Sequence, residues 1–116
     1  MKLTILGSGV MTPSQNRYPS SYLIEGDDKK VLLDCGFLSL ARLTEYGVDP
    51  QAIDAVAISH FHTDHFGGFL PLVHCRMVDS IHKNEQYKKL KILGPKTIEE
   101  RYKKLREVMW PEPNEI

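Results

Sequence analysis

The sequence predicts a mixed α/β (α+β) sandwich in which helices pack against a sheet, and three observations support this prediction. The length, 116 residues, suits a single domain. The composition is 41% hydrophobic and 26% charged, close to the average of globular proteins, which excludes disordered, collagen-like and coiled-coil chains. Short apolar runs broken by Gly and Pro come first, and strand–helix units follow.

The first half of the chain predicts mainly strands. Apolar stretches separated by turn-forming residues give four expected strands and one helix, at 2–6, 21–25, 30–34 and 54–58 for the strands and 38–46 for the helix. Residues 7–19 are expected to form a loop. The segment Gly26-Asp27-Asp28-Lys29 has the composition of a hairpin turn, and Gly47 follows the helix as a C-terminal cap.

The second half predicts helices around one short strand. Helical spacing of apolar residues gives a helix over 69–81, with Leu70, Val73, Met77 and Ile81 on one side. A strand is expected at 90–93, followed by a helix from 97 that ends at Pro111. Residues 111–116 are rich in Pro and Glu, and we expect them to begin a linker within a chain that is otherwise a single domain.

Overall charge and hydrophobicity indicate neither a nucleic-acid nor a membrane partner. Fifteen basic and fifteen acidic residues give no net charge, and no apolar run approaches the ~20 residues that span a bilayer. The apolar stretch at the N-terminus is too short for a signal peptide, so we expect a cytoplasmic protein. Cys35 and Cys75 have no CxxC spacing and are predicted to be reduced, buried thiols.

The segment His60-Phe61-His62-Thr63-Asp64-His65 differs from the rest of the chain because it contains three of the five histidines. Imidazole and carboxylate groups are the ligands that borderline-soft divalent metals bind. His60 and His62 alternate along an extended strand end, so both project to one side. Asp64 and His65 follow where the chain turns into a helix, and two ligand pairs around a turn can hold two ions. His60, His62, Asp64 and His65 are therefore predicted metal ligands, whereas His74 and His82 are expected on the surface or at a helix end.

The motif His-x-His-x-Asp-His after an apolar strand resembles the signature of the metallo-β-lactamase superfamily. The segment Val31–Gly36 is similar to the strand that ends in Asp-x-Gly in this family. The resemblance implies that its aspartate, here Asp34, supports the metal ligands without binding the metal itself. The opening glycines, Ser20-Ser21 and the segment 92–96 are similar to the ribonuclease Z-like branch.

Two departures from that branch qualify the resemblance. Ribonuclease Z usually has glycine at the position of Thr63, and its Gly-Leu-Pro segment comes one residue earlier than here, which favours a relative of that enzyme. The family fold is an αββα sandwich of two facing halves, with a further His, a bridging Asp and a last His in the second half. After His65 this chain offers only His74, Asp79 and His82. It therefore resembles the N-terminal half of the fold.

The resemblance implies metal-assisted hydrolysis. His60 and His62 would bind one zinc ion, Asp64 and His65 a second, and a hydroxide bridging both would be the nucleophile. Asp64 would also orient this water or accept its proton, as the catalytic residue. Histidine at position 62 resembles the zinc members of the superfamily, and manganese and iron are the alternative metals. The implied substrate is a phosphodiester; RNA belongs to this class, although the overall charge does not indicate it.

Two other functions remain open from the sequence. One is hydrolysis of a thioester or lactone at the same site. The other is that these 116 residues are a catalytically incomplete fragment, or one subunit of a split protein, with two half-built metal sites. Such a half-sandwich would expose an apolar face, which a missing C-terminal half or a second copy would cover.

Overall fold

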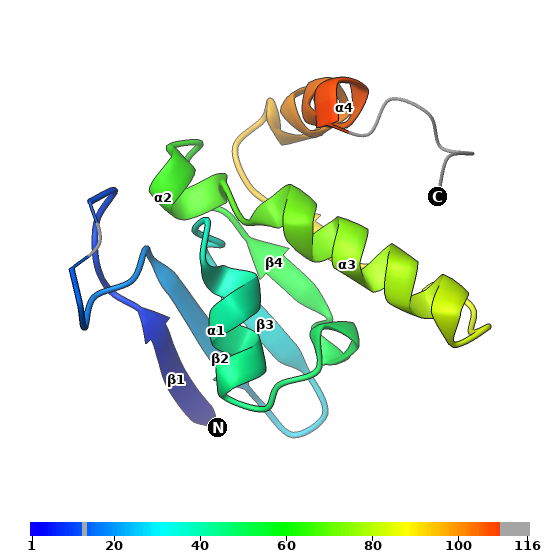
Figure 1. The fold of residues 1–116 in the computed structure, drawn as a ribbon, viewed down its shortest axis with the longest axis horizontal. Helices are drawn as coiled ribbons and strands as arrows, with labels where there is room; N and C mark the ends of the chain where they lie inside the picture. Colours follow the sequence, from blue (N-terminus) through cyan, green and yellow to red (C-terminus); the bar gives the residue numbers. More distant parts are fainter. Residues whose placement is uncertain (13, 110–116) are drawn as a thin grey trace.

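The computed structural model describes residues 1–12 and 14–109, so the linker expected at 111–116 and the helix stop at Pro111 lie outside the described residues. Figure 1 shows the arrangement of the elements. Along the chain these are β1 (Lys2–Gly7), β2 (Ser21–Glu25), β3 (Lys30–Leu33), α1 (Ser39–Glu45), the 3₁₀ helix η1 (Pro50–Ala52), β4 (Ala55–Ala57), α2 (Thr63–Phe66), α3 (Phe69–His82), β5 (Lys91–Leu93) and α4 (Ile98–Met109). All expected strands and helices are present, and within the described residues their ends lie within two residues of the expected ones. The 3₁₀ helix η1 was not expected, and the turn expected at Asp64 and His65 forms the separate short helix α2.

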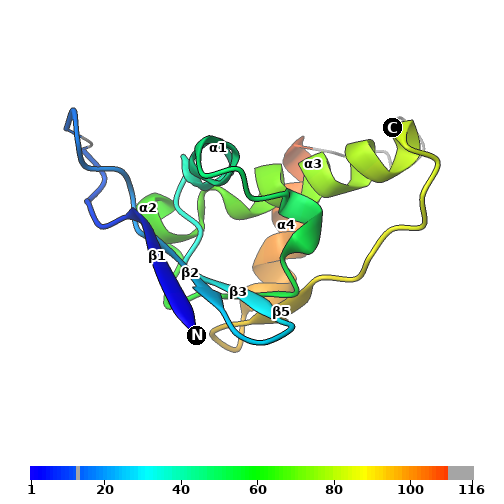
Figure 2. The same ribbon diagram turned by 90° about the horizontal axis from the view of Figure 1, so that it is seen from below.

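The strands form one sheet in the order β1-β2-β3-β4-β5. The first three are antiparallel neighbours, whereas β3, β4 and β5 run parallel. Parallel neighbours need a crossover connection, which α1 supplies between β3 and β4, and α2 with α3 between β4 and β5. Because both crossovers step in the same direction and such connections are right-handed, their helices lie on the same face of the sheet. Figure 2 shows this one-sided arrangement.

The hydrophobic core lies between this helical layer and the sheet. Alternate strand residues and the facing sides of α1 and α3 are fully buried there, including Leu6, Leu23, Leu32, Val56, Leu43, Phe69 and Leu72. Each such side chain contributes about 1.5–3 kcal/mol relative to exposure. Ile98, Tyr102 and Leu105 of α4 pack only partly against this core, so α4 is the more loosely attached helix.

The opposite face of the sheet is also mainly apolar, although none of the helices within residues 1–12 and 14–109 covers it. Strand register and side-chain alternation place one set of residues on this open face, all apolar except Lys91 and the amphipathic Tyr22: Leu3, Ile5, Tyr22, Ile24, Val31, Leu33, Ala55, Ala57, Lys91 and Leu93. Leu3 and Ile5 are 59% and 53% exposed. A sheet with a solvated face normally carries polar residues there. This open face therefore has the composition of a surface that packs against protein.

Arg76 is a charged side chain buried completely within α3. Its Nη1 donates to the carbonyl oxygens of Pro50 at 2.6 Å and Ile53 at 2.9 Å, and its Nη2 donates to that of Lys88 at 2.8 Å. These bonds join α3 to the segments that lead into β4 and β5. The guanidinium thus supplies donors to three carbonyl groups, one of which, that of Pro50, also accepts the Ile53 N–H at 3.4 Å.

Replacing Arg76 by methionine should lower the free energy of unfolding by about 2–4 kcal/mol, because carbonyls left without a donor in a buried setting are costly. Lys83→Met is the control, since Lys83 is on the surface and its ion pair with Asp79 contributes at most about 1 kcal/mol. Urea unfolding measures both. Equal losses in the two variants would contradict the clamping role of Arg76.

The two cysteines differ in their surroundings, and both are free thiols. Cys35 is buried as expected, and burial raises the pKa of its thiol to about 12. The expectation of burial is wrong for Cys75, which is half-buried; its helix position faces the shallow hollow between α3 and η1 rather than the sheet. Among residues 1–12 and 14–109, no helix is long and apolar enough to cross a membrane.

The difference in burial between the two thiols predicts which one a thiol-specific reagent labels in the folded chain at about pH 8. Since the thiolate is the reacting form, Cys75 should react, whereas Cys35 should react only after unfolding. Mass spectrometry of the digested protein would identify the labelled residue. Fast labelling of Cys35 under native conditions would contradict the burial described here.

Candidate metal centre

The predicted ligands lie at the carboxyl ends of two neighbouring parallel strands. Asp34 directly follows β3, and the segment from Ser59 to His65 follows β4. Pairing of the strands, Leu33 beside Ala57, brings these two strand ends to one edge of the sheet, and the Asp34 N–H donates to the Ala57 carbonyl at 2.7 Å. This edge is the usual place for ligand binding in parallel sheets.

The single turn α2 reverses the chain between the two ligand pairs. The carbonyl of His62 accepts the N–H groups of His65 and Phe66, each at 2.9 Å. This turn brings His65 back over His60, with the ring centroids 4.0 Å apart, while the centroids of His60 and His62 are 4.8 Å apart. Three imidazoles therefore converge from positions before and after the turn.

Asp34 joins the two sides of this cluster. Its Oδ1 accepts the N–H of Ser59 at 2.7 Å, and its Oδ2 accepts the Ser59 hydroxyl at 2.8 Å. The same Oδ2 lies 2.7 Å from Nδ1 of His65. A histidine that donates Nδ1–H to a carboxylate has Nε2 free as a ligand, which is the common arrangement behind metal-binding histidines.

Serine 59 extends this support to His60. Its Oγ lies 3.0 Å from Nδ1 of His60 while the hydroxyl donates to Asp34. The serine oxygen can then accept Nδ1–H of His60, which again leaves Nε2 for a metal. Ser59 is not among the residues that the sequence predicts for the site. Its position immediately before the first histidine is the one signal that would have marked it.

The donor set fits a divalent metal in chemistry and spacing. Nε2 of His65 lies 3.4 Å from Oδ2 of Asp64, and two ligands of a tetrahedral zinc ion, each roughly 2.0–2.1 Å from it, are about 3.3 Å apart. Within residues 1–12 and 14–109 no three His, Cys, Asp or Glu side chains are placed to hold one ion. The predicted arrangement of two ligands for each of two ions does not need such a group.

Close backbone packing holds residues 59–65, which contain the predicted metal ligands and are called the metal-binding loop below, against the turn after β3. The Cys35 N–H donates to the carbonyl of His65 at 2.7 Å, and the Gly68 N–H donates to that of Cys35 at 2.9 Å. A Cβ on Gly36 would lie 2.5 Å from the carbonyl oxygen of Asp64. Only glycine permits this approach.

Two other histidines lie apart in the chain from this loop. His74 is half-buried within α3, and His82 is exposed as its last residue. The expected helix-end position of His82 is confirmed.

Asp34 provides a direct test of this support. Asp34 has φ 55°, a left-handed conformation that asparagine also adopts readily, so Asp34→Asn should keep the backbone and lose the charged acceptor. We expect zinc affinity, measured by competition with a chromophoric chelator, to fall about 10–100-fold. Asp28→Asn, in the turn at 26–29, should leave it unchanged. An Asp34→Asn variant with unaltered affinity would contradict the role of Asp34.

Fold and loop together are those of the metallo-β-lactamase superfamily, in its ribonuclease Z-like branch. The structure resembles the crystal structure of the short form of human tRNase Z, with a TM-score of 0.78 and 27% identity over 97% of this chain and 40% of that one. It also resembles the metallo-β-lactamase-fold protein YhfI of Bacillus subtilis, with a TM-score of 0.77 and 32% identity over 89% of this chain and 41% of that one.

Within this superfamily the chain belongs to the family described as Anti-Pycsar protein Apyc1, whose model matches residues 1–113. Among curated relatives, ribonuclease Z of Methanopyrus kandleri is 38% identical over 93 residues, which are 80% of this chain and 31% of that enzyme. The match to YhfI covers 32% of its length. The chain thus spans about a third of the curated relatives it matches.

Proposed function

We propose that the chain carries the N-terminal half of the metal centre of a binuclear zinc hydrolase that cleaves phosphodiesters. The proposal rests on one observation: the Asp34 carboxylate accepts hydrogen bonds from Ser59 and lies 2.7 Å from Nδ1 of His65, whose ring lies beside that of His60 in the metal-binding loop. In it, His60 and His62 bind one ion, and Asp64 and His65 bind the other. Manganese or iron are the alternatives, because the same ligands accept them.

The chain's own residues would have distinct tasks in this reaction. Divalent metal supplies Lewis acidity and an activated water when bound. Asp34 holds the His65 imidazole in the tautomer whose Nε2 faces outward. Asp64 is half-buried beside it, and its carboxylate has two oxygens, so one can bind metal while the other accepts a proton from the attacking water.

Relatives support phosphodiester chemistry over the alternatives. Several curated relatives, at 33–39% identity, are named ribonuclease Z, and RNA is a phosphodiester polymer. Thioester and lactone hydrolysis could use the same ligands. The test is hydrolysis of bis(p-nitrophenyl) phosphate, RNA and cyclic nucleotides against thioesters and lactones, using protein purified from its native source with metal. Turnover confined to thioesters or lactones would contradict the proposed substrate class.

Replacing Asp64 by asparagine should lower phosphodiester turnover about 10²–10⁴-fold, since it removes a proton-accepting group and a charged ligand. Asp27→Asn, in the turn at 26–29, is the matched control and should keep the wild-type rate. Steady-state assays at saturating zinc, on the complete protein that includes the second half, measure both. Near-normal turnover by Asp64→Asn would contradict its catalytic role.

The open sheet face supports a second half as the missing part of the centre. Its apolar residues lie on the side of the sheet that no described helix covers, and relatives are about three times as long as the part matched here. Two protein ligands leave a metal weakly held. The isolated chain should therefore bind zinc weakly and lack turnover. Sub-micromolar zinc affinity with clear turnover by an isolated monomer would contradict the need for a second half or a second copy.

A further inference from the structure

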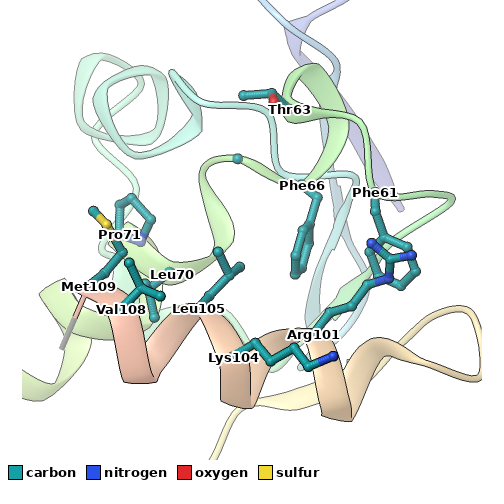
Figure 3. Close-up of a pocket in the computed structure, with 11 residues that line it drawn as sticks. Phe61, Thr63, Phe66, Leu70, Pro71, Arg101, Lys104, Leu105, Val108 and Met109 are labelled. Carbon is teal, nitrogen blue, oxygen red and sulfur yellow. The ribbon is translucent and has the colours of Figure 1, made fainter. Parts of the chain in front are cut away.

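The metal-binding loop has a reverse side that contacts α4. Phe61 lies between His60 and His62, so side-chain alternation directs it away from them. Figure 3 shows Phe61 and Phe66 facing α4, with the Arg101 side chain extended along Phe61. The guanidinium carbon of Arg101 lies 4.3 Å from the centre of the Phe61 ring, within the range of a cation–π interaction.

This contact is one end of a continuous aromatic row. Phe61 meets Phe66 edge to face at 5.2 Å between ring centres, and Phe66 stacks on Phe69 at 5.6 Å. Phe69 in turn meets Tyr102 edge to face at 5.6 Å. The row thus starts and ends on two consecutive residues of α4, Arg101 and Tyr102, and passes through the metal-binding loop, α2 and α3.

Beyond this row, α4 packs loosely. None of its residues 98–109 is fully buried, and a pocket of about 530 Å³ separates it from α2 and the start of α3. Leu70, Pro71 and Leu105 line this pocket, with Val108 exposed at one side. The aromatic row is therefore a route by which α4 can act on the loop.

We propose that Arg101 is a positioning residue for the metal-binding loop. Its guanidinium, stacked on Phe61, holds the segment His60-Phe61-His62 so that both imidazoles keep their separation. Nε of Arg101 donates to the Thr97 hydroxyl at 3.3 Å, which orients the guanidinium plane. This inference rests on the proposed metal centre. Loss of an exposed cation–π contact corresponds to about a two- to fivefold change in an equilibrium.

The test compares Arg101→Ala with Lys104→Ala. Lys104 lies one turn further along α4, is exposed and lines the same pocket, but it pairs with Glu100 rather than with the loop. Zinc affinity, measured by chelator competition, should fall about two- to fivefold in Arg101→Ala and stay at the wild-type value in Lys104→Ala. Arg101→Lys should restore part of the loss, because lysine keeps the charge and lacks the flat stacking surface.

A second readout separates this inference from the proposed function. Amide hydrogen exchange across residues 60–65, measured without metal, should be faster in Arg101→Ala and in Phe61→Leu than in Lys104→Ala. Adding Arg101→Ala to Phe61→Leu should give no further acceleration, since Phe61→Leu already removes the ring that Arg101 contacts. If the wild-type chain bound no zinc, the proposed function would fail while exchange still decided the role of Arg101. If amide exchange and zinc affinity were identical in Arg101→Ala and Lys104→Ala, the positioning role of Arg101 would be overturned.

Discussion

The candidate site depends on one carboxylate. Asp34 stands in the left-handed region, which costs a residue other than glycine on the order of 1–3 kcal/mol. In return, its oxygens receive the Ser59 N–H, the Ser59 hydroxyl and Nδ1 of His65, and hydrogen bonds to a charged group contribute about 1.5–3 kcal/mol each. The hydrogen bonds outweigh the backbone cost. The conformation that they stabilise ties the end of β3 to the loop after β4.

The topology of the sheet explains why this carboxylate meets the histidines. β3 and β4 are parallel neighbours, so residues that follow each strand arrive at the same edge although they are 25 or more positions apart in sequence. The same parallel crossovers collect the helices on one face and leave the other face apolar. The parallel order of the strands thus brings the candidate ligands together at one edge of the sheet. It also leaves open the apolar face on which a second half, with further ligands, would pack.

Much of the fold could be predicted because it is encoded locally. Alternating apolar residues and turn signals located the strands, and the spacing of Leu70, Val73 and Met77 located α3. The same pattern assigned Ile81 to the buried side, whereas it is exposed near the end of α3 and Arg76 is buried. The helix extends past the sheet there, and three distant carbonyls compensate the charge. The spacing of apolar residues within one helix cannot predict hydrogen bonds to carbonyl groups this far away in the sequence.

The candidate site also has a part that the local sequence predicts and a part that depends on contacts made only after folding. The histidine motif marked four candidate ligands, and the resemblance pointed to Asp34, which hydrogen-bonds Ser59 and His65 and whose supporting role stays a prediction. The sequence predicted a turn into a helix at Asp64 and His65, but not α2 as a separate helix, because four residues are too few for a periodicity. The links from Ser59 to His60 and from Arg101 to Phe61 depend on how side chains meet after folding. The ligand assignment itself remains a prediction.

The most direct test of the central claim is the metal content of the protein, measured by native mass spectrometry on material from its native source. We predict two zinc ions for each copy of the motif, and at most one when His60 and His62 are both replaced by alanine. This spectrum would also reveal any companion chain or longer polypeptide that completes the centre. A zinc count that is unchanged in the double variant, or a wild-type protein that retains no metal, would contradict a binuclear centre built on this motif.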